Sequence, residues 1–228
     1  MRLVFLLCLA LFAASCGRPL TEAEKGFLKE IHGDGTDLSR VRLTTFSTVG
    51  SIERTYLARP RTTCRELILP PIEQKSFKSR TAGLVLSNRI FLNPDWYLEE
   101  YLEDWPEQLN LVAAMFLAHE ITHVWQWQNR AVTGYHPLKA AAEHKLHVDP
   151  YLFDPASKTR FLDYPYEQQA SLVEEFVCCR ALDPAGSRTA RLRALLSQAM
   201  NPAPLELSRP VSNVMIPWED AEIEGICS

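Results

Sequence analysis

The sequence predicts an α+β fold, a mainly helical domain with a small β-sheet packed on its central helix. Three stretches lead to this prediction. Residues 109–130 carry apolar side chains at helical spacing without Gly or Pro, and residues 164–182 form a second helical pattern. Residues 83–93 read as two short strands around Ser87 and Asn88. We expect this small sheet to pack on the first of the two helices.

The first 15 residues resemble a bacterial signal peptide. Arg2 precedes an apolar run, residues 3–14, that is too short to span a bilayer as a stable helix. Residues 11–16 (LFAASC) resemble a lipobox, in which cleavage leaves Cys16 as a lipidated N-terminus. Gly17 in the second mature position resembles an outer-membrane address. We therefore expect a bacterial outer membrane lipoprotein that faces the periplasm and is held by lipid on Cys16; ordinary cleavage near Ser15, giving a soluble periplasmic protein, is the alternative.

Residues 16–228 are long enough for one domain with a substantial core, and we expect a single domain. Removal of Arg2 with the signal takes the formal net charge from -4 to -5. The chain is mildly acidic and has no basic stripe. A nucleic-acid partner is therefore not expected.

The cysteine content predicts disulfides in an oxidising compartment. If Cys8 is removed and Cys16 is lipidated, four cysteines remain, namely Cys64, Cys178, Cys179 and Cys227. A bond between adjacent Cys178 and Cys179 would be strained, and on a helix their side chains diverge. Each is expected to pair with one of the other two, which leaves two pairings open. Zinc binding by cysteine is disfavoured because no Cys-x-x-Cys spacing occurs.

Before the central helix the chain gives weaker signals. Residues 21–31 are charged and helix-forming, and Thr21 with Glu24 makes a capping-box pattern that Gly33 follows. Residues 41–69 contain short β-prone pieces with unsafe boundaries. In the 83–93 hairpin an edge strand could hold an extended peptide by strand addition, although a plain packed hairpin is the alternative.

The central helix carries His119-Glu120-Ile121-Thr122-His123, a His-Glu-x-x-His pentad. Asp104-Trp105-Pro106 precedes this helix as its expected cap and first turn. Two histidines four residues apart share one helix face, so both imidazoles can reach one metal ion. Glu120 then lies beside the ion, where a carboxylate can accept a proton from metal-activated water. The alternative is a pair of structural histidines, but the pair framing Glu120 favours a Zn²⁺ site.

A third ligand must come from elsewhere in the chain. The spacing His-Glu-x-x-His-x-x-Gly-x-x-His fails, because Gln126 and Asn129 occupy its last two positions. A glutamate on the second helix is the other common solution. Pro165 opens that helix, Glu167 lies in its first turn, and Ala170 on the same face is small enough to let two helices approach closely.

The pentad and the downstream Glu-Gln-Gln-Ala, with 43 residues between His123 and Glu167, resemble the gluzincin type of zinc metallopeptidase. His-Glu-Ile-Thr-His-Val-Trp-Gln is similar to uncharacterised bacterial envelope lipoproteins with zincin-like domains. The resemblance covers about residues 82–182. It implies that His119, His123 and Glu167 bind Zn²⁺ and that Glu120 is the general base acting on a peptide or protein substrate. Rivals for the third ligand are Glu174, His144, His147 and Asp149.

The chain departs from the thermolysin-like pattern around Glu167. The aspartate that would orient a ligating histidine is absent, so Ser171, Glu174 or a backbone carbonyl must take its place. A donor to the oxyanion is also needed. Tyr166 is the expected donor, with four other candidates: Tyr164, His136, His144 and His147. Aromatic side chains could line a substrate groove or fill the core; these are Trp125, Trp127, Tyr135 and Tyr151.

The sequence thus predicts a zinc-dependent metallopeptidase of the cell envelope. The alternative is a non-catalytic lipoprotein that uses a zincin scaffold for binding or assembly. After residue 182 we expect one more helix over residues 188–200. A proline-rich tail should follow and end in a disulfide at Cys227.

Overall fold

The computed structural model describes residues 17–144, 148–154, 157, 160–204 and 213–228. The signal peptide, Cys16 and His147 lie outside these residues, so their predicted roles stay predictions. The described helices are α2 (Glu22–His32), α3 (Cys64–Leu67), α4 (Leu111–Gln128), α5 (Arg130–Thr133), α6 (Pro137–Glu143), α7 (Tyr166–Leu182) and α8 (Ser187–Leu196), with short 3-10 turns η1 (Leu38–Arg40), η2 (Pro94–Trp96) and η3 (Phe161–Asp163). The described strands are β1 (Arg42–Thr45), β2 (Glu53–Leu57), β3 (Ser76–Arg80), β4 (Gly83–Leu86), β5 (Arg89–Leu92), β6 (Gln108–Asn110) and β7 (Asn213–Met215).

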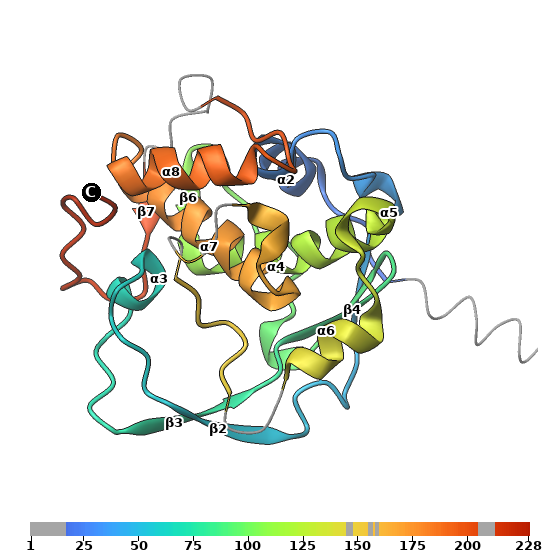
Figure 1. Cartoon of the computed structure of the whole chain (residues 1–228), viewed down its shortest axis with the longest axis horizontal. Coiled ribbons are helices and arrows are strands. Elements are labelled where there is room, and N and C mark those ends of the chain that lie inside the picture. The colour runs from blue at the N-terminus through green and yellow to red at the C-terminus, as the bar shows by residue number, and fades with distance from the viewer. Residues whose placement is uncertain (1–16, 145–147, 155–156, 158–159, 205–212) are drawn as a thin grey trace, which may run out of the picture.

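Helices α4 and α7 pack against each other at the centre of the molecule, with α2 and α8 close by (Figure 1). Fifteen of the 18 residues of α4 are buried, so this helix is surrounded by protein on nearly all sides. Its first residue is Leu111, later than the sequence predicted. Leu109 pairs with Val214 in a short parallel ladder, so the backbone stays extended until Asn110, whose side chain accepts from Ala113 N and caps the helix.

A three-stranded sheet in the order β1-β5-β4 packs on α4 through β4, which confirms the predicted α+β fold. Strands β4 and β5 form the antiparallel hairpin expected over residues 83–93, and Ser87 takes a positive φ of 61° in its turn. Strand β1 joins β5 in parallel. Because β4 has β5 on one side only, it is an edge strand of this sheet.

Strands β2 and β3 form a separate antiparallel ribbon, which runs below the helices in the view of Figure 1. Neither strand pairs with the other sheets. Side chains alternate along the ribbon, so Arg54, Tyr56, Phe77 and Ser79 share one face and are partly buried.

The capping box and the disulfides are present as expected. Helix α2 begins with the capping box of Thr21 and Glu24 and ends at Gly33, where φ is 66°. Disulfides join Cys64 to Cys178 and Cys179 to Cys227, which confirms that each adjacent cysteine has one distant partner. Helix α8 ends at Leu196, earlier than predicted. Among the described residues, no helix has the length and apolar character that crossing a membrane requires.

Candidate metal centre

Three side chains from α4 and α7 meet at one point. His119 Nε2 lies 3.2 Å from His123 Nε2, and Glu167 Oε2 lies 3.4 Å from His119 Nε2 and 3.3 Å from His123 Nε2. All three residues are buried. The helical spacing of four residues brings the imidazoles together, and the first turn of α7 brings the carboxylate to them. These three donors could hold a metal ion.

The spacing of the donors can be compared with a tetrahedral zinc site. Bonds of about 2.0–2.1 Å at tetrahedral angles place neighbouring ligand atoms about 3.3 Å apart. The three distances between the donors of His119, His123 and Glu167 match this value. Two imidazole nitrogens and one carboxylate oxygen are also donors that suit zinc. The residues present therefore fit the ion that the sequence predicted.

Gln126 fixes the orientation and the tautomer of His123. The Gln126 amide nitrogen donates to Tyr166 O and to Gln169 Oε1, each at 3.0 Å, so its oxygen must face the histidine. That oxygen lies 2.9 Å from His123 Nδ1 and accepts its proton. Nε2 is therefore the nitrogen that faces the other two donors and that would bind a metal ion.

Glu167 is held from two sides. Its Oε2 faces the two pentad imidazoles, and its Oε1 lies 2.9 Å from His144 Nε2. Burial alone would raise the pKa of Glu167, but the positive charge of His123 and hydrogen bonds from His119, His123 and His144 hold it well below its usual range. Glu167 is therefore an ionised carboxylate, as a metal ligand must be.

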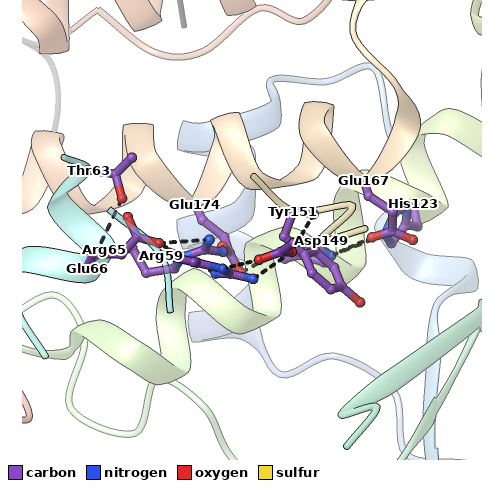
Figure 2. A network of polar contacts seen from close by, with 10 residues as sticks. Arg59, Thr63, Arg65, Glu66, His123, Asp149, Tyr151, Glu167 and Glu174 are labelled. Atoms are coloured by element: carbon purple, nitrogen blue, oxygen red, sulfur yellow. Dashed lines mark hydrogen bonds and ion pairs between the residues drawn. The ribbon is translucent and has the colours of Figure 1, made fainter. Parts of the chain in front are cut away.

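The rivals for the third ligand lie elsewhere. Glu174 Oε1 lies 3.2 Å from Nδ1 of His119, on the far side of the ring from the other donors. The contact is close but is not aligned as a hydrogen bond. Figure 2 shows Glu174 beside Arg65, and Asp149 beside Arg59. His144 contacts Oε1 of Glu167, the carboxylate oxygen that faces away from the two pentad imidazoles. The buried hydroxyl of Ser171 has no hydrogen-bond partner, so Glu174 is the nearer replacement for the missing aspartate.

The environment of His119 favours its charged form while no metal competes. Burial opposes a charge on this ring, but the carboxylates of Glu174 and Glu167 outweigh it and raise the pKa of His119 to about 10. Glu174 and Glu167 thus place two negative charges beside the buried histidines. Such a charge balance favours a bound cation.

Glu120 lies beside these donors and next to the edge strand. It is buried, and burial raises the pKa of Glu120 above its usual value, although His119 and His123 oppose the rise. A methyl group at Gly83, the first residue of β4, would lie only 2.5 Å from Glu120 Oε1. The base expected from the pentad and the edge strand expected from residues 83–93 are therefore neighbours.

These residues form one wall of a cavity of about 1130 Å³. The volume is slightly above the range of small-molecule sites, roughly 300–1,000 Å³. Strand β4 and one face of the β2–β3 ribbon also line the cavity, and most of the lining is apolar. His119, His123, Glu120 and Glu167 all line it. The three candidate donors and Glu120 are thus open to this cavity.

The aromatic residues divide between cavity and core. Tyr135 and Tyr151 line the cavity, and Tyr151 lies 5.8 Å from His119 between ring centroids. The hydroxyl of Tyr166 donates to Gly134 O at 2.8 Å, and Tyr166 does not line the cavity. Its predicted role as oxyanion donor stays a prediction. Trp125 is buried against Phe161, whereas Trp127 lies under the guanidinium of Arg130 away from the cavity.

The remaining oxyanion candidates also have other contacts. Tyr164 donates to Asp154 O, and His136 Nδ1 accepts from Leu138 N at the start of α6. Neither lines the cavity, whereas His144 does. Sequence reasoning did not find Gln126 as the partner of His123 or Arg65 as the partner of Glu174. The position of Gln126, one helical turn after His123, is a signal that could have found the first.

Comparisons with known proteins give little further guidance. No protein-family model matches the chain, and no curated protein matches it. Among solved structures, the effector domain of Pseudomonas aeruginosa VgrG2b is similar with a TM-score of 0.48 and 21% sequence identity. The match covers 81% of this chain and 84% of that chain. A likeness at this level does not identify the activity, and the gluzincin resemblance stays a prediction.

Proposed function

We propose that this chain is a zinc-dependent metallopeptidase of the bacterial cell envelope. One observation carries the proposal: the donors of His119, His123 and Glu167 converge at 3.2–3.4 Å, inside a cavity and beside the buried carboxylate of Glu120. A structural metal site is usually closed by four protein ligands. Three ligands, an adjacent base and an open cavity are what catalysis needs.

His119, His123 and Glu167 would hold the ion. Zn²⁺ bound there would supply Lewis acidity, which lowers the pKa of water and polarises a carbonyl oxygen. Glu120 accepts a proton from the water that adds to the amide carbon. The same carboxyl then delivers that proton to the amine nitrogen as the carbon–nitrogen bond breaks. The raised pKa of Glu120 suits both steps, because its proton affinity is brought nearer to neutral pH.

Strand β4 would hold the substrate. Its free edge offers backbone amides and carbonyls to an extended peptide, and its first residue touches Glu120. Tyr135, Tyr151 and His144 line the same cavity and can each donate to the developing oxyanion.

For location we propose a lipid anchor on Cys16 in the outer membrane, with the domain facing the periplasm. The described chain begins at Gly17, and Arg18 already bridges to Leu43 of β1. Such an anchor would therefore leave almost no spacer between the lipid and the folded domain. Mass spectrometry of the protein from membranes tests this: a lipid-modified N-terminal Cys16 is expected, and a mature N-terminus without lipid would contradict it.

Metal analysis and a peptide-library digest test the activity. We expect one zinc per chain and cleavage that is lost in Glu120→Gln, with zinc content unchanged. Protein with no zinc site would contradict the proposal. Zinc binding without cleavage, and with cellular phenotypes unchanged in Glu120→Gln, would favour the non-catalytic scaffold instead.

A further inference from the structure

We infer that Arg65, acting through the carboxylate of Glu174, positions the metal ligand His119. Both are positioning residues, since neither side chain reaches the convergence point of the three donors. The inference rests on the proposed function only in that zinc binds at that point. It concerns metal affinity and geometry and does not require that the site cleave peptides.

Glu174 lies between a metal ligand and an arginine. Its Oε1 is 3.2 Å from His119 Nδ1, and its Oε2 forms an ion pair with Arg65. A carboxylate beside Nδ1 keeps the proton on that nitrogen and the lone pair on Nε2, where the metal binds. His123 uses the neutral amide of Gln126 for the same purpose. The two histidines therefore have different outer partners, and only His119 has a charged one.

Arg65 supplies a charge that Glu174 needs. A buried carboxylate without a cation nearby is strongly unfavourable. His119 cannot provide that cation once it serves as a neutral ligand. The guanidinium of Arg65 stays charged under all relevant conditions, so it balances Glu174 whether or not metal is bound.

The direction of Arg65 is fixed by a second carboxylate. Its Nε and one terminal nitrogen both contact Glu66 Oε1, at 3.2 and 3.1 Å. The other terminal nitrogen is the one that contacts Glu174. Figure 2 shows this chain of contacts running along α7 from α3 toward the metal-binding group. Only the planar fork of arginine can serve both carboxylates at once.

A disulfide holds α3 in place. Cys64, the first residue of α3, is bonded to Cys178 of α7, and its backbone amide donates to Glu175 Oε1 at 3.0 Å. Cys178 follows Glu174 by four residues and so lies on the same helix face. One face of α7 thus carries Glu167 as ligand, Glu174 as outer partner and Cys178 as anchor. The disulfide at Cys178 holds α3, α3 carries Arg65, and Arg65 contacts Glu174 beside the metal ligand.

Zinc affinity, measured by competition with a chromogenic chelator, tests the inference. We expect Arg65→Met and Glu174→Gln each to weaken zinc binding about 10- to 100-fold. If Arg65 acts through Glu174, the double variant loses no more affinity than Glu174→Gln alone. Losses that multiply in the double variant, or an unchanged affinity in Arg65→Met, would overturn the inference.

A matched arginine on the same helix is the control. Arg180 of α7 is partly buried and pairs with Glu30 of α2, and it contacts none of the three donors. Arg180→Met removes a comparable ion pair, so we expect it to lower stability and leave zinc affinity unchanged. The visible spectrum of the Co²⁺-loaded protein adds a readout of ligand geometry: its bands should change in Glu174→Gln and stay unchanged in Arg180→Met.

The outcomes separate this inference from the proposed function. Wild-type protein that binds zinc but cleaves no peptide sinks the peptidase and leaves the positioning test intact. Cleavage by the wild type with unaltered affinity in both single variants sinks the positioning role alone. Should Arg65→Met fail to fold, Arg65→Lys replaces it. Lysine keeps the charge but cannot bind both carboxylates, so a smaller loss of affinity is expected and an unchanged affinity counts against the inference.

Discussion

The backbone of Gly83 lies directly against the carboxylate of Glu120, and a methyl group at position 83 would lie 2.5 Å from Glu120 Oε1. The φ of Gly83 is not in the left-handed region, so glycine is not required there by its backbone conformation. Glycine is needed there because position 83 has no room for a side chain. The edge strand can approach the proposed base only because this residue has no side chain.

Gly83→Ala therefore tests the arrangement of strand and base. The added methyl collides with the end of a side chain that can rotate, so we expect little change in stability and a displaced carboxylate. Peptide cleavage should fall at least about tenfold, since a misplaced base loses much of its catalytic contribution of 10²–10⁴. Zinc content should not change, because Glu120 is not among the three donors. Gly35→Ala is the control, because its methyl would meet Trp125 at an ordinary 3.5 Å; equal activity in both variants would refute the arrangement.

The metal-binding group was largely predictable because local rules fix most of it. Helical geometry alone places His119 and His123 on one face, and the resemblance at Glu167 supplied the third donor. The 83–93 hairpin follows from alternating apolar residues around a turn. The pentad and the hairpin depend on residues close together in the sequence, whereas Glu167 was found only through the resemblance.

The outer partners were only partly predictable from the sequence, since Glu174 was one of three candidates to orient a ligating histidine but its partner Arg65 was not found. Arg65 and Glu174 are 109 residues apart, and their contact depends on how α3 docks on α7. The adjacency of Cys178 and Cys179 excluded one disulfide pattern but could not choose between the other two. The late start of α4 was missed because its cause, the pairing of Leu109 with Val214, also lies far along the chain.

Gln126→Met should weaken zinc binding, because the ring of His123 loses the hydrogen bond that orients it. The substitution keeps the volume nearly unchanged but removes the acceptor at His123 Nδ1 and the two donations to Tyr166 and Gln169. Loss of such a partner lowers metal affinity about 10- to 100-fold. Chelator competition measures the change. Gln128→Met is the control, because the Gln128 amide donates hydrogen bonds to Asp37 and Asn88 and not to His123. This variant should keep the zinc affinity of the wild type. A similar loss in both variants would show that the effect is not specific to the partner of His123.

The two disulfides should have similar effects on stability and different effects on metal binding. They join residues 114 and 48 positions apart, and chain entropy gives each roughly 4 to 5 kcal/mol of stabilisation. Replacing Cys64 and Cys178 by serine frees α3, so zinc affinity should fall about tenfold as the outer partner of His119 loosens. Replacing Cys179 and Cys227 leaves α3 anchored, and affinity should hold. Thermal melts and zinc titrations of the two double variants decide this, and equal zinc affinities would count against the link.

His32 should make the metal-free protein lose stability in mild acid. Its ring is buried, its Nε2 lies 3.0 Å from Thr122 Oγ1, and its Nδ1 has no hydrogen-bond partner, so burial lowers the pKa of His32 to about 4. Because the folded pKa lies below the unfolded value of about 6.5, the contribution is complete above pH 6.5 and is lost as the pH falls toward 4. A shift of this size corresponds to roughly 3 kcal/mol.

Urea unfolding at a series of pH values, with a chelator present, measures this loss. His119 does not confuse the result, because the pKa of His119 is raised to about 10 and the ring is protonated in both folded and unfolded chains below about pH 6. His32→Gln has no titrating group at this position. The unfolding free energy of the wild type minus that of the variant should therefore fall as the pH falls from 6.5 to 4. A difference that stays constant over this range would show that His32 is not held neutral between α2 and α4.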